Sequence, residues 1–299
     1  MVLVGTTASG KSDLAFALAC ARPGVEIVSV DSMSVYREMD IATAKPTVEH
    51  RARVRHHLID LVDPAEEFTV SMFQRAARDA LADIERRHRR ALLVGGTGLY
   101  VSAVVDDLAL PGRWPEVAAT LEAEADRPDG VAPLYRRLLE LDPLAASRIT
   151  PENRRRIVRA LEVTIGSGRP FSSFGPGLEA YPPTRFVQIG IRFEPALVDR
   201  RIEERFNRWM DAGLLEEVRA LAARPAGLSR TARQALGYRE LLEHVRGDLP
   251  LADAIERALQ RTRAFARRQW AWFRRDPRIA WVGEDQDPVE VLGAALDGP

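Results

Sequence analysis

Two residue types are scarce in this 299-residue chain, cysteine and lysine. Cys20 is the only cysteine, which excludes an intrachain disulfide and a zinc site built from cysteines. The formal net charge is zero, so any binding of nucleic acid must come from a local basic patch. No apolar run approaches the roughly 20 residues of a membrane span. Because a predicted strand begins at the first residue, we expect no leader peptide and a cytoplasmic protein without membrane contact.

Only two of the 43 basic residues are lysines, and both lie in motif-like segments. Lys11 belongs to the segment Gly-Thr-Thr-Ala-Ser-Gly-Lys-Ser at 5–12, and Lys45 to Ile-Ala-Thr-Ala-Lys-Pro at 41–46. Lysine is a compact point charge and arginine a planar fork, so lysine is expected to persist where a guanidinium cannot substitute. The pattern around Lys45 indicates no chemical role.

Strands and helices alternate in the first hundred residues. Apolar strands are predicted at 1–4, 25–30 and 91–94, with helices at 13–21 and 69–90. With 46% hydrophobic residues to build a core, this order predicts an α/β fold with a parallel sheet flanked by helices.

The pattern changes after residue 112. It is helical to about 167, irregular at 171–183, strand-like at 186–193 and helical again from 195, with breaks near 225–227 and 247. We therefore predict a core domain of residues 1–112 and 186–299, interrupted by a mostly helical insertion domain of residues 113–185.

The segment 5–12 has the full pattern of a phosphate-binding loop between a strand and a helix. In such loops backbone N–H groups cradle phosphate oxygens, the lysine neutralises them and the hydroxyl binds Mg²⁺. The pattern predicts a P-loop NTPase-like core and a polyphosphate ligand. The predicted contacts are Gly5, Thr6, Thr7, Ala8, Ser9, Gly10, Lys11 and Ser12, with Ser12 as the metal ligand.

Three side-chain or loop positions follow predicted strands, namely Gly5, Asp31 and Thr97. Ligands of parallel sheets lie at the carboxyl ends of the strands, so these positions should converge on one crevice. The strand at 91–94 ends in Gly-Gly-Thr-Gly and lacks the aspartate that usually holds Mg²⁺ in nucleotide hydrolases. Asp31 is the available carboxylate, as a metal ligand through water, as a general base or as a loop cap.

Seven segments in order along residues 5–273 resemble the tRNA dimethylallyltransferase (isopentenyl-tRNA transferase) family. They lie at 5–12, 31–46, 56–60, 95–100, 155–163, 234–240 and 267–273. Ser34 stands where relatives often have glutamine, which puts one contact to the tRNA base in doubt. Eukaryotic relatives add a zinc finger that a chain with one cysteine cannot form, so the resemblance is to the bacterial type.

The resemblance implies a reaction. A dimethylallyl group would pass from dimethylallyl diphosphate to N6 of adenosine 37, beside the anticodon of tRNAs reading codons that begin with U, giving N6-dimethylallyladenosine and diphosphate. Asp31 would be the base, and Lys11, Thr97 and Mg²⁺ would complete the catalytic set, in a protein we expect to be a monomer. Residues implied to contact the anticodon stem-loop are Asp31, Ser32, Met33, Ser34, Thr97, Arg155, Arg156, Ile157, Val158, Arg159, Gln234, Gly237, Tyr238, Arg239, Arg267, Arg268 and Gln269.

Two basic clusters favour an RNA partner. Eight arginines and two acids lie between Ile255 and Arg278, interleaved with aromatic residues. Helical spacing predicts that Phe265, Trp270 and Phe273 are mostly core and that the arginines mostly face RNA. The second cluster, Arg154–Arg156 with Arg159, would contact tRNA from the insertion or form a solvated helix face.

Three other functional hypotheses remain open. A small-molecule kinase would bind ATP at 5–12, but the carboxylate after residue 94 is missing. A prenyltransferase acting on free AMP would not need the basic clusters. A GTPase-like switch would need a guanine-reading Asn-Lys-x-Asp motif, which neither lysine fits. The pair His56-His57 suggests a structural role rather than a metal site.

Overall fold

The computed structural model describes residues 1–175, 177–283 and 286–297. The chain divides into two compact units, one of Met1–Asp106 with Tyr181–Pro299 and one of Asp107–Ala180. The first unit carries the sheet and the second is helical. The insertion predicted at 113–185 therefore begins and ends slightly earlier in the structure.

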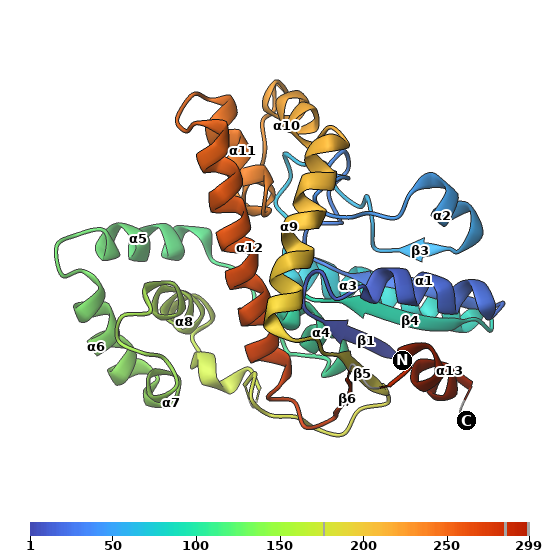
Figure 1. Ribbon diagram of the computed structural model, residues 1–299. Coiled ribbons are helices and arrows are strands. Elements are labelled where there is room, and N and C mark those ends of the chain that lie inside the picture. Colours follow the sequence, from blue (N-terminus) through green and yellow to red (C-terminus); the bar gives the residue numbers. More distant parts are fainter. Residues whose placement is uncertain (176, 284–285, 298–299) are drawn as a thin grey trace. The chain divides into compact units, whose positions relative to one another are not determined.

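The first unit is built on a six-stranded sheet whose paired strands are all parallel (Figure 1). Its order is β3-β2-β4-β1-β5-β6. The chain passes from β1 to β2 and β3 on one side and later to β5 and β6 on the other, which opens a ligand crevice at the carboxyl end of β1. The strands are β1 (Val2–Gly5), β2 (Val25–Val30), β3 (His56–His57), β4 (Arg90–Gly95), β5 (Gln188–Ile191) and β6 (Ile279–Val282).

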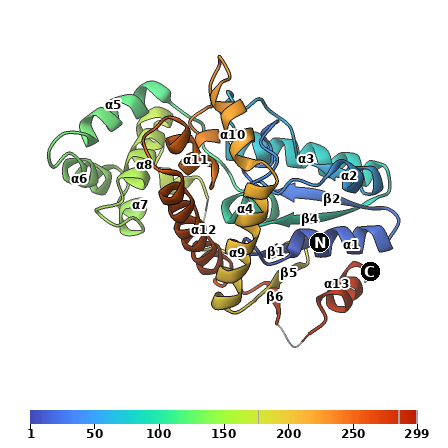
Figure 2. The ribbon, with the colours of Figure 1, turned by 45° about the horizontal axis from the view of Figure 1, so that its top comes forward.

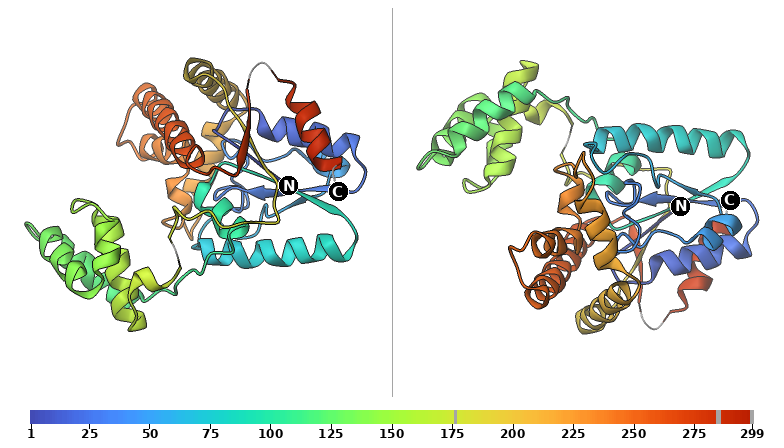
Figure 3. Two further views of the ribbon diagram at one scale, coloured as in Figure 1. Left: turned by 90° about the horizontal axis from the view of Figure 1, so that it is seen from below. Right: turned by 90° about the horizontal axis from the view of Figure 1, so that it is seen from above.

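Helices cover both faces of this sheet, which confirms the predicted α/β class. One face packs against α1 (Lys11–Ala21) and α13 (Pro288–Asp297) through a core that includes Leu3 and Leu92. The other packs against α3 (Val70–Arg86) and α4 (Gly98–Val105). Figure 3 shows α1 and α3 on opposite sides of the strands. Burial on both faces explains why the strands read as continuous apolar runs.

Four α-helices lie between β5 and β6 in the chain, and two of them approach the carboxyl end of β1. They are α9 (Pro195–Asp211), α10 (Leu214–Ala222), α11 (Tyr238–Val245) and α12 (Leu251–Phe273). Helices α9 and α12 lie side by side (Figure 2). The buried stripe of α12 recurs every three or four residues as Ala254, Ala258, Thr262, Ala266, Gln269 and Phe273. Its small residues allow close packing against the core. A short helix, α2 (Val48–Arg53), precedes β3.

The second unit is a small helical bundle with its own core. It contains α5 (Pro115–Ala125), α6 (Val131–Leu141), α7 (Pro143–Ser147) and α8 (Arg154–Ser167). Leu121, Leu138 and Leu161 are buried at its centre. Asn153 accepts the Arg156 N–H at 3.2 Å and so begins α8 with a side-chain cap. The predicted helical content of the insertion is confirmed.

Several predicted boundaries were wrong. The helix expected at 69–90 ends at Arg86, because the chain turns at His88 (φ 54°) so that Arg90 can pair with Val25 in the sheet. The strand expected at 186–193 is confined to β5. Strands β3 and β6 were missed, since two and four residues are too few for a periodic signal. Within the described residues, no helix is long and apolar enough to cross a membrane.

Candidate active site

The phosphate loop connects β1 to α1 as predicted. Ala8 (φ 62°) and Gly10 (φ 76°) adopt left-handed conformations, and Gly10 stands immediately before the helix. Left-handed residues among right-handed ones turn successive N–H groups toward one concave side, which is the geometry of an anion nest. The buried Ser9 hydroxyl has no hydrogen-bond partner in the structure. The loop thus presents donors to a ligand.

Two half-buried cations meet at this loop, Lys11 and Arg205. Lys11 donates to the Thr6 carbonyl at 3.1 Å, and Arg205, from α9, donates to the Thr7 hydroxyl at 2.6 Å. Within the described part of the chain, neither forms an ion pair with a carboxylate. Burial, together with Arg205, lowers the pKa of Lys11 to about 8, which nearby Asp31 partly opposes. Burial also lowers the pKa of Arg205 to about 10. Neither cation is therefore neutralised by direct contact with a carboxylate of the described residues, although Asp31 lies close enough to oppose the lowering of both pKa values.

Asp31 and Thr97 lie at neighbouring strand ends, as predicted. Asp31 follows β2, and its Oδ1 accepts the N–H groups of Met33 at 2.7 Å and Ser34 at 3.3 Å. Thr97 follows β4, and its hydroxyl accepts the Ser32 N–H at 3.3 Å. Since β2 and β4 pair in register up to Val30 and Gly95, the two loops start side by side. Asp31, Ser32 and Thr97 are therefore brought together.

The glycines after β4 are required by what packs against them. A Cβ on Gly95 would lie 2.0 Å from the Val30 carbonyl, and one on Gly98 would lie 2.4 Å from the Trp272 ring. A Cβ on Gly96 would lie 2.3 Å from the Gln269 amide nitrogen. At positions 95, 96 and 98, strand and helix therefore approach too closely for a side chain, and a carboxylate is excluded there.

Lys45 has a structural environment that the sequence did not reveal. Its side chain is 1% exposed, and its ammonium contacts Asp40 at 2.7 Å, Asp60 at 2.5 Å and the Tyr36 carbonyl. Arg51 holds the second oxygen of Asp60 at 2.6 Å. An ammonium has three donors, and here each has an acceptor. Lys45 therefore fastens the loop that begins at Asp31 to the segment around Asp60.

The predicted RNA contact Tyr238 serves the same loop. Tyr238 is fully buried, and its hydroxyl bonds Glu217 at 2.5 Å and the Ala42 N–H at 3.3 Å. Glu217 also accepts the Asp40 and Ile41 N–H groups. Burial raises the pKa of Glu217 and, with the neighbouring carboxylate, that of Tyr238. Gly237 donates its N–H to Glu240 at 3.0 Å, which caps α11. An RNA contact by Gly237 and Tyr238 stays a prediction.

The other residues of the predicted RNA surface divide by exposure. Arg239, Arg267, Arg268 and Gln234 are exposed, whereas Ser34 is buried against the Ser29 hydroxyl. Gln269 is buried between two loops. Among the eight arginines at 255–278, Arg257, Arg261, Arg263 and Arg278 pair with acids. Phe273 is core as predicted, while Phe265 and Trp270 are only half-buried.

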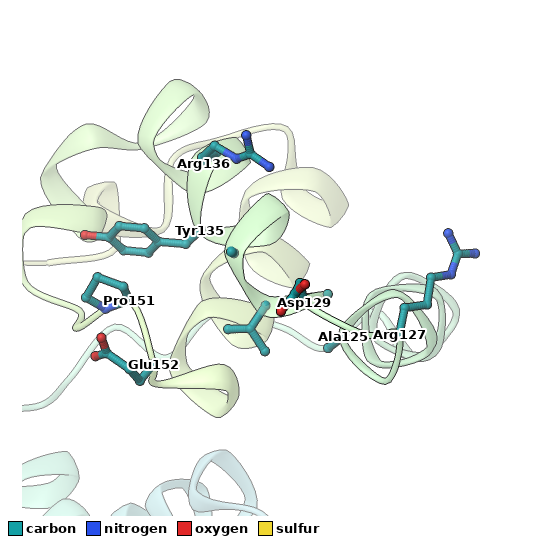
Figure 4. A pocket seen from close by; sticks show the side chains of 10 residues that line it. Ala125, Arg127, Asp129, Tyr135, Arg136, Pro151 and Glu152 are labelled. Atoms are coloured by element: carbon teal, nitrogen blue, oxygen red, sulfur yellow. The ribbon is translucent and has the colours of Figure 1, made fainter.

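In the helical unit the predicted contacts also divide. Arg155 and Arg156 are exposed, but Ile157 and Val158 are buried in its core. Arg159 is held by Glu162 and the carbonyls of 111–112. An open pocket of this unit is lined by side chains such as Arg127, Tyr135 and Glu152 (Figure 4). None of the predicted site residues lines it.

The histidine pair lies in the sheet. His57 is 2.7 Å from Glu26, which also pairs with Arg87. The arginine hydrogen bonds lower the pKa of Glu26 to about 2 despite its burial. No group of three or more His, Cys, Asp or Glu side chains that could hold a metal ion occurs within the described residues.

Together these features define an α/β protein of the phosphate-loop class, with a carboxylate and a hydroxyl beside an anion nest. A family model described as IPP transferase matches residues 34–276. A tRNA dimethylallyltransferase of Geobacter metallireducens is 47% identical over 284 residues, covering 94% of this chain and 91% of its own. One from Nocardioides sp. is 45% identical and covers 100% and 97%.

Solved structures agree with the sequence matches. The tRNA isopentenylpyrophosphate transferase of Bacillus halodurans has a TM-score of 0.70 at 35% identity, covering 98% of this chain and 94% of its own. A eukaryotic dimethylallyltransferase described as acting on tRNA has a TM-score of 0.75 at 27% identity, covering 94% and 73%. The chain belongs to the IPP transferase family, which confirms the resemblance seen in its sequence.

Proposed function

We propose that this protein transfers the dimethylallyl group of dimethylallyl diphosphate to N6 of adenosine 37 in tRNAs that read codons beginning with U. The N6 lone pair forms a bond to the allylic C1 while the C1–O bond breaks. The electron pair of that bond leaves with diphosphate, and the N6 proton passes to a base. The products are N6-dimethylallyladenosine and diphosphate. Two findings support this proposal. The curated relatives are tRNA dimethylallyltransferases, and the residues that follow β1, β2 and β4 lie at the same edge of the sheet.

The observation that carries the proposal is the pair of half-buried cations, Lys11 and Arg205, which form no ion pair with a carboxylate of the described residues. The leaving diphosphate gains negative charge as the C1–O bond breaks, and preorganised donors stabilise such charge most effectively. Lys11 and Arg205 both contact the phosphate loop and offer that stabilisation. Sequence reasoning missed Arg205, because nothing in its own segment distinguishes it from the other arginines.

Asp31 is the proposed base. Its Oδ1 accepts two backbone N–H groups, and its Oδ2 has no hydrogen-bond partner among the described residues. Oδ2 is therefore the oxygen we assign to the proton from N6. Thr97, which accepts the Ser32 N–H, helps to hold the acceptor side of the site.

A Mg²⁺ ion is the proposed cofactor. Mg²⁺ prefers oxygen ligands, keeps several waters and commonly binds through few protein groups plus phosphate oxygens. The exposed Ser12 hydroxyl at the start of α1 and the nearby Asp31 carboxylate fit that donor set. When bound, the ion would neutralise charge on the diphosphate.

The exposed arginines favour tRNA over free AMP as the acceptor. Arg267 and Arg268 on α12 and Arg274, which directly follows it, are exposed and extend over a length that a mononucleotide cannot span. We also propose that Arg155 and Arg156 of the helical unit contact the anticodon stem-loop. Reading a stacked base requires extruding it and holding the flanking backbone. We expect the protein to act as a monomer in the cytoplasm.

One assay tests the proposal against its rivals. The protein is incubated with Mg²⁺, labelled dimethylallyl diphosphate and either tRNA or AMP. The expected result is label in tRNA that carries adenosine 37 and none in tRNA with guanosine at that position. Label in AMP would favour the mononucleotide acceptor. Phosphate transfer from labelled ATP, with no prenyl transfer, would favour a kinase.

A further inference from the structure

Gln269 lies at the centre of the site but has no exposed surface for RNA. It is 6% exposed on the buried face of α12. Its Oε1 accepts the Thr7 N–H at 2.7 Å, and its Nε2 donates to the Gly96 carbonyl at 2.8 Å. The amide orientation follows from its partners, since an N–H can only donate and a carbonyl can only accept. One planar group thus joins the loop after β1 to the loop after β4.

The surroundings of this amide are shaped for it. Gly96 has no room for a side chain, because a Cβ would lie 2.3 Å from Nε2 and 3.1 Å from the Gly5 carbonyl. Thr7 is held a second time by Arg205 through its hydroxyl at 2.6 Å. Arg205 of α9 and Gln269 of α12 therefore both hydrogen-bond Thr7 of the phosphate loop.

We infer that Gln269 is a positioning residue for prenyl transfer, fixing the diphosphate side of the site relative to the acceptor side. This inference rests on the function proposed above. The Thr7 loop holds the leaving group, and Gly96 directly precedes Thr97 on the acceptor side. A misplacement of about 1 Å between reacting groups can cost on the order of 100-fold in rate. Gln269 therefore acts through the two loops and touches neither substrate.

The first test uses Gln269→Glu and pH. An ionised glutamate accepts the Thr7 N–H but cannot donate to Gly96, whereas a protonated glutamate does both. We expect kcat of Gln269→Glu, relative to the wild type, to rise at least tenfold from pH 8.5 to pH 6. Gln260, which is exposed on the same helix and bonds Glu256 at 2.9 Å, gives the control. Gln260→Glu should show no such dependence.

The second test uses Gly96→Ala alone and with Gln269→Ala. The added methyl displaces the carboxamide, so Gly96→Ala should lower kcat at least tenfold in the wild type. Once Gln269 is alanine, the clash with its carboxamide is gone and only the 3.1 Å contact with the Gly5 carbonyl remains, so the additional loss should be less than twofold. Thermal melts of each variant report whether it is folded. The coupling is read from the folded variants, and the pH test needs no change at Gly96.

Specific results would overturn the inference. Gln269→Leu should leave tRNA affinity, measured by filter binding, within twofold of the wild type while kcat falls at least tenfold. A tenfold weaker affinity with normal kcat would instead make Gln269 an RNA contact. Independent losses for Gly96→Ala and Gln269→Ala, or a flat relative pH profile for Gln269→Glu, would also contradict it. A wild-type protein that transfers no label fails the proposed function itself, and the positioning role with it.

Discussion

Lys11 is half-buried and the Lys45 side chain is almost fully buried, and the surroundings of the two differ in charge. Lys11 has one carbonyl as its hydrogen-bond acceptor and no carboxylate partner within the described residues, and burial lowers its pKa to about 8. Lys45 contacts two carboxylates and a carbonyl. Burying an unpaired charge opposes folding, whereas a satisfied one is tolerated. The contrast indicates that Lys11 is kept for an anionic ligand and Lys45 for the shape of a loop.

The same contrast explains why neither residue is an arginine. At Lys11 a compact charge must fit beside the amides of a tight loop. At Lys45 three acceptors surround one nitrogen, which suits the three donors of an ammonium and not a planar fork. Each lysine can therefore be changed with a distinct expected outcome.

The largest effect is expected for Lys11→Met. Removing one preorganised donor to developing charge typically costs about 10²–10³-fold in kcat. The same change removes a half-buried charge without a counter-ion, so the free energy of unfolding should stay the same or rise. Steady-state prenyl transfer and urea denaturation measure the two quantities. A stable variant with near-normal kcat would remove Lys11 from the catalytic set.

Lys45→Met should have the opposite effect, lowering stability and leaving ligand binding unchanged. It breaks hydrogen bonds to charged partners in a buried position, so the free energy of unfolding should fall by about 2–3 kcal/mol. Affinity for diphosphate should stay within twofold. Lys45→Arg keeps the charge but not the geometry and should restore little of the stability. Full stability in Lys45→Arg would show that charge alone matters there.

The depressed pKa of Lys11 predicts a pH dependence. With the pKa lowered from 10.5 to about 8, the ammonium is charged below pH 8 and loses its proton above it. The KM for dimethylallyl diphosphate should therefore rise about tenfold between pH 7 and pH 9. Lys11→Met should lack this rise, and Lys45→Met should retain it. A rise that persists in Lys11→Met would assign the titration to another group.

The smallest expected effect is a thermal shift. A ligand at 100 times its Kd stabilises the folded state by about 2.7 kcal/mol. Diphosphate should therefore raise the Tm of the wild type by several degrees. Lys45→Met should start at a lower Tm and show the same shift, whereas Lys11→Met should show none. Equal shifts in all three proteins would place the ligand elsewhere.

Sequence reasoning recovered what depends on local pattern. The phosphate loop, Asp31 after β2 and Thr97 after β4 follow from strand ends and loop chemistry, and each lies where it was expected. Arg205 was missed because only the packing of α9 against the loop distinguishes it from other arginines. Tyr238 and Gln269 were predicted to contact tRNA from their motifs, and a motif shows that a residue type matters but does not reveal the protein contacts that these residues also make. Those contacts depend on how elements that are distant in the sequence pack together in the folded protein.

The most direct test of the central claim is calorimetric titration of inorganic diphosphate, with Mg²⁺, into the wild type, Lys11→Met and Lys45→Met. We expect Lys11→Met to raise the Kd for diphosphate about 100-fold, equivalent to about 2.7 kcal/mol. Lys45→Met should leave this Kd within twofold of the wild type. Equal affinity of Lys11→Met and the wild type, or an equal loss in both variants, would contradict it.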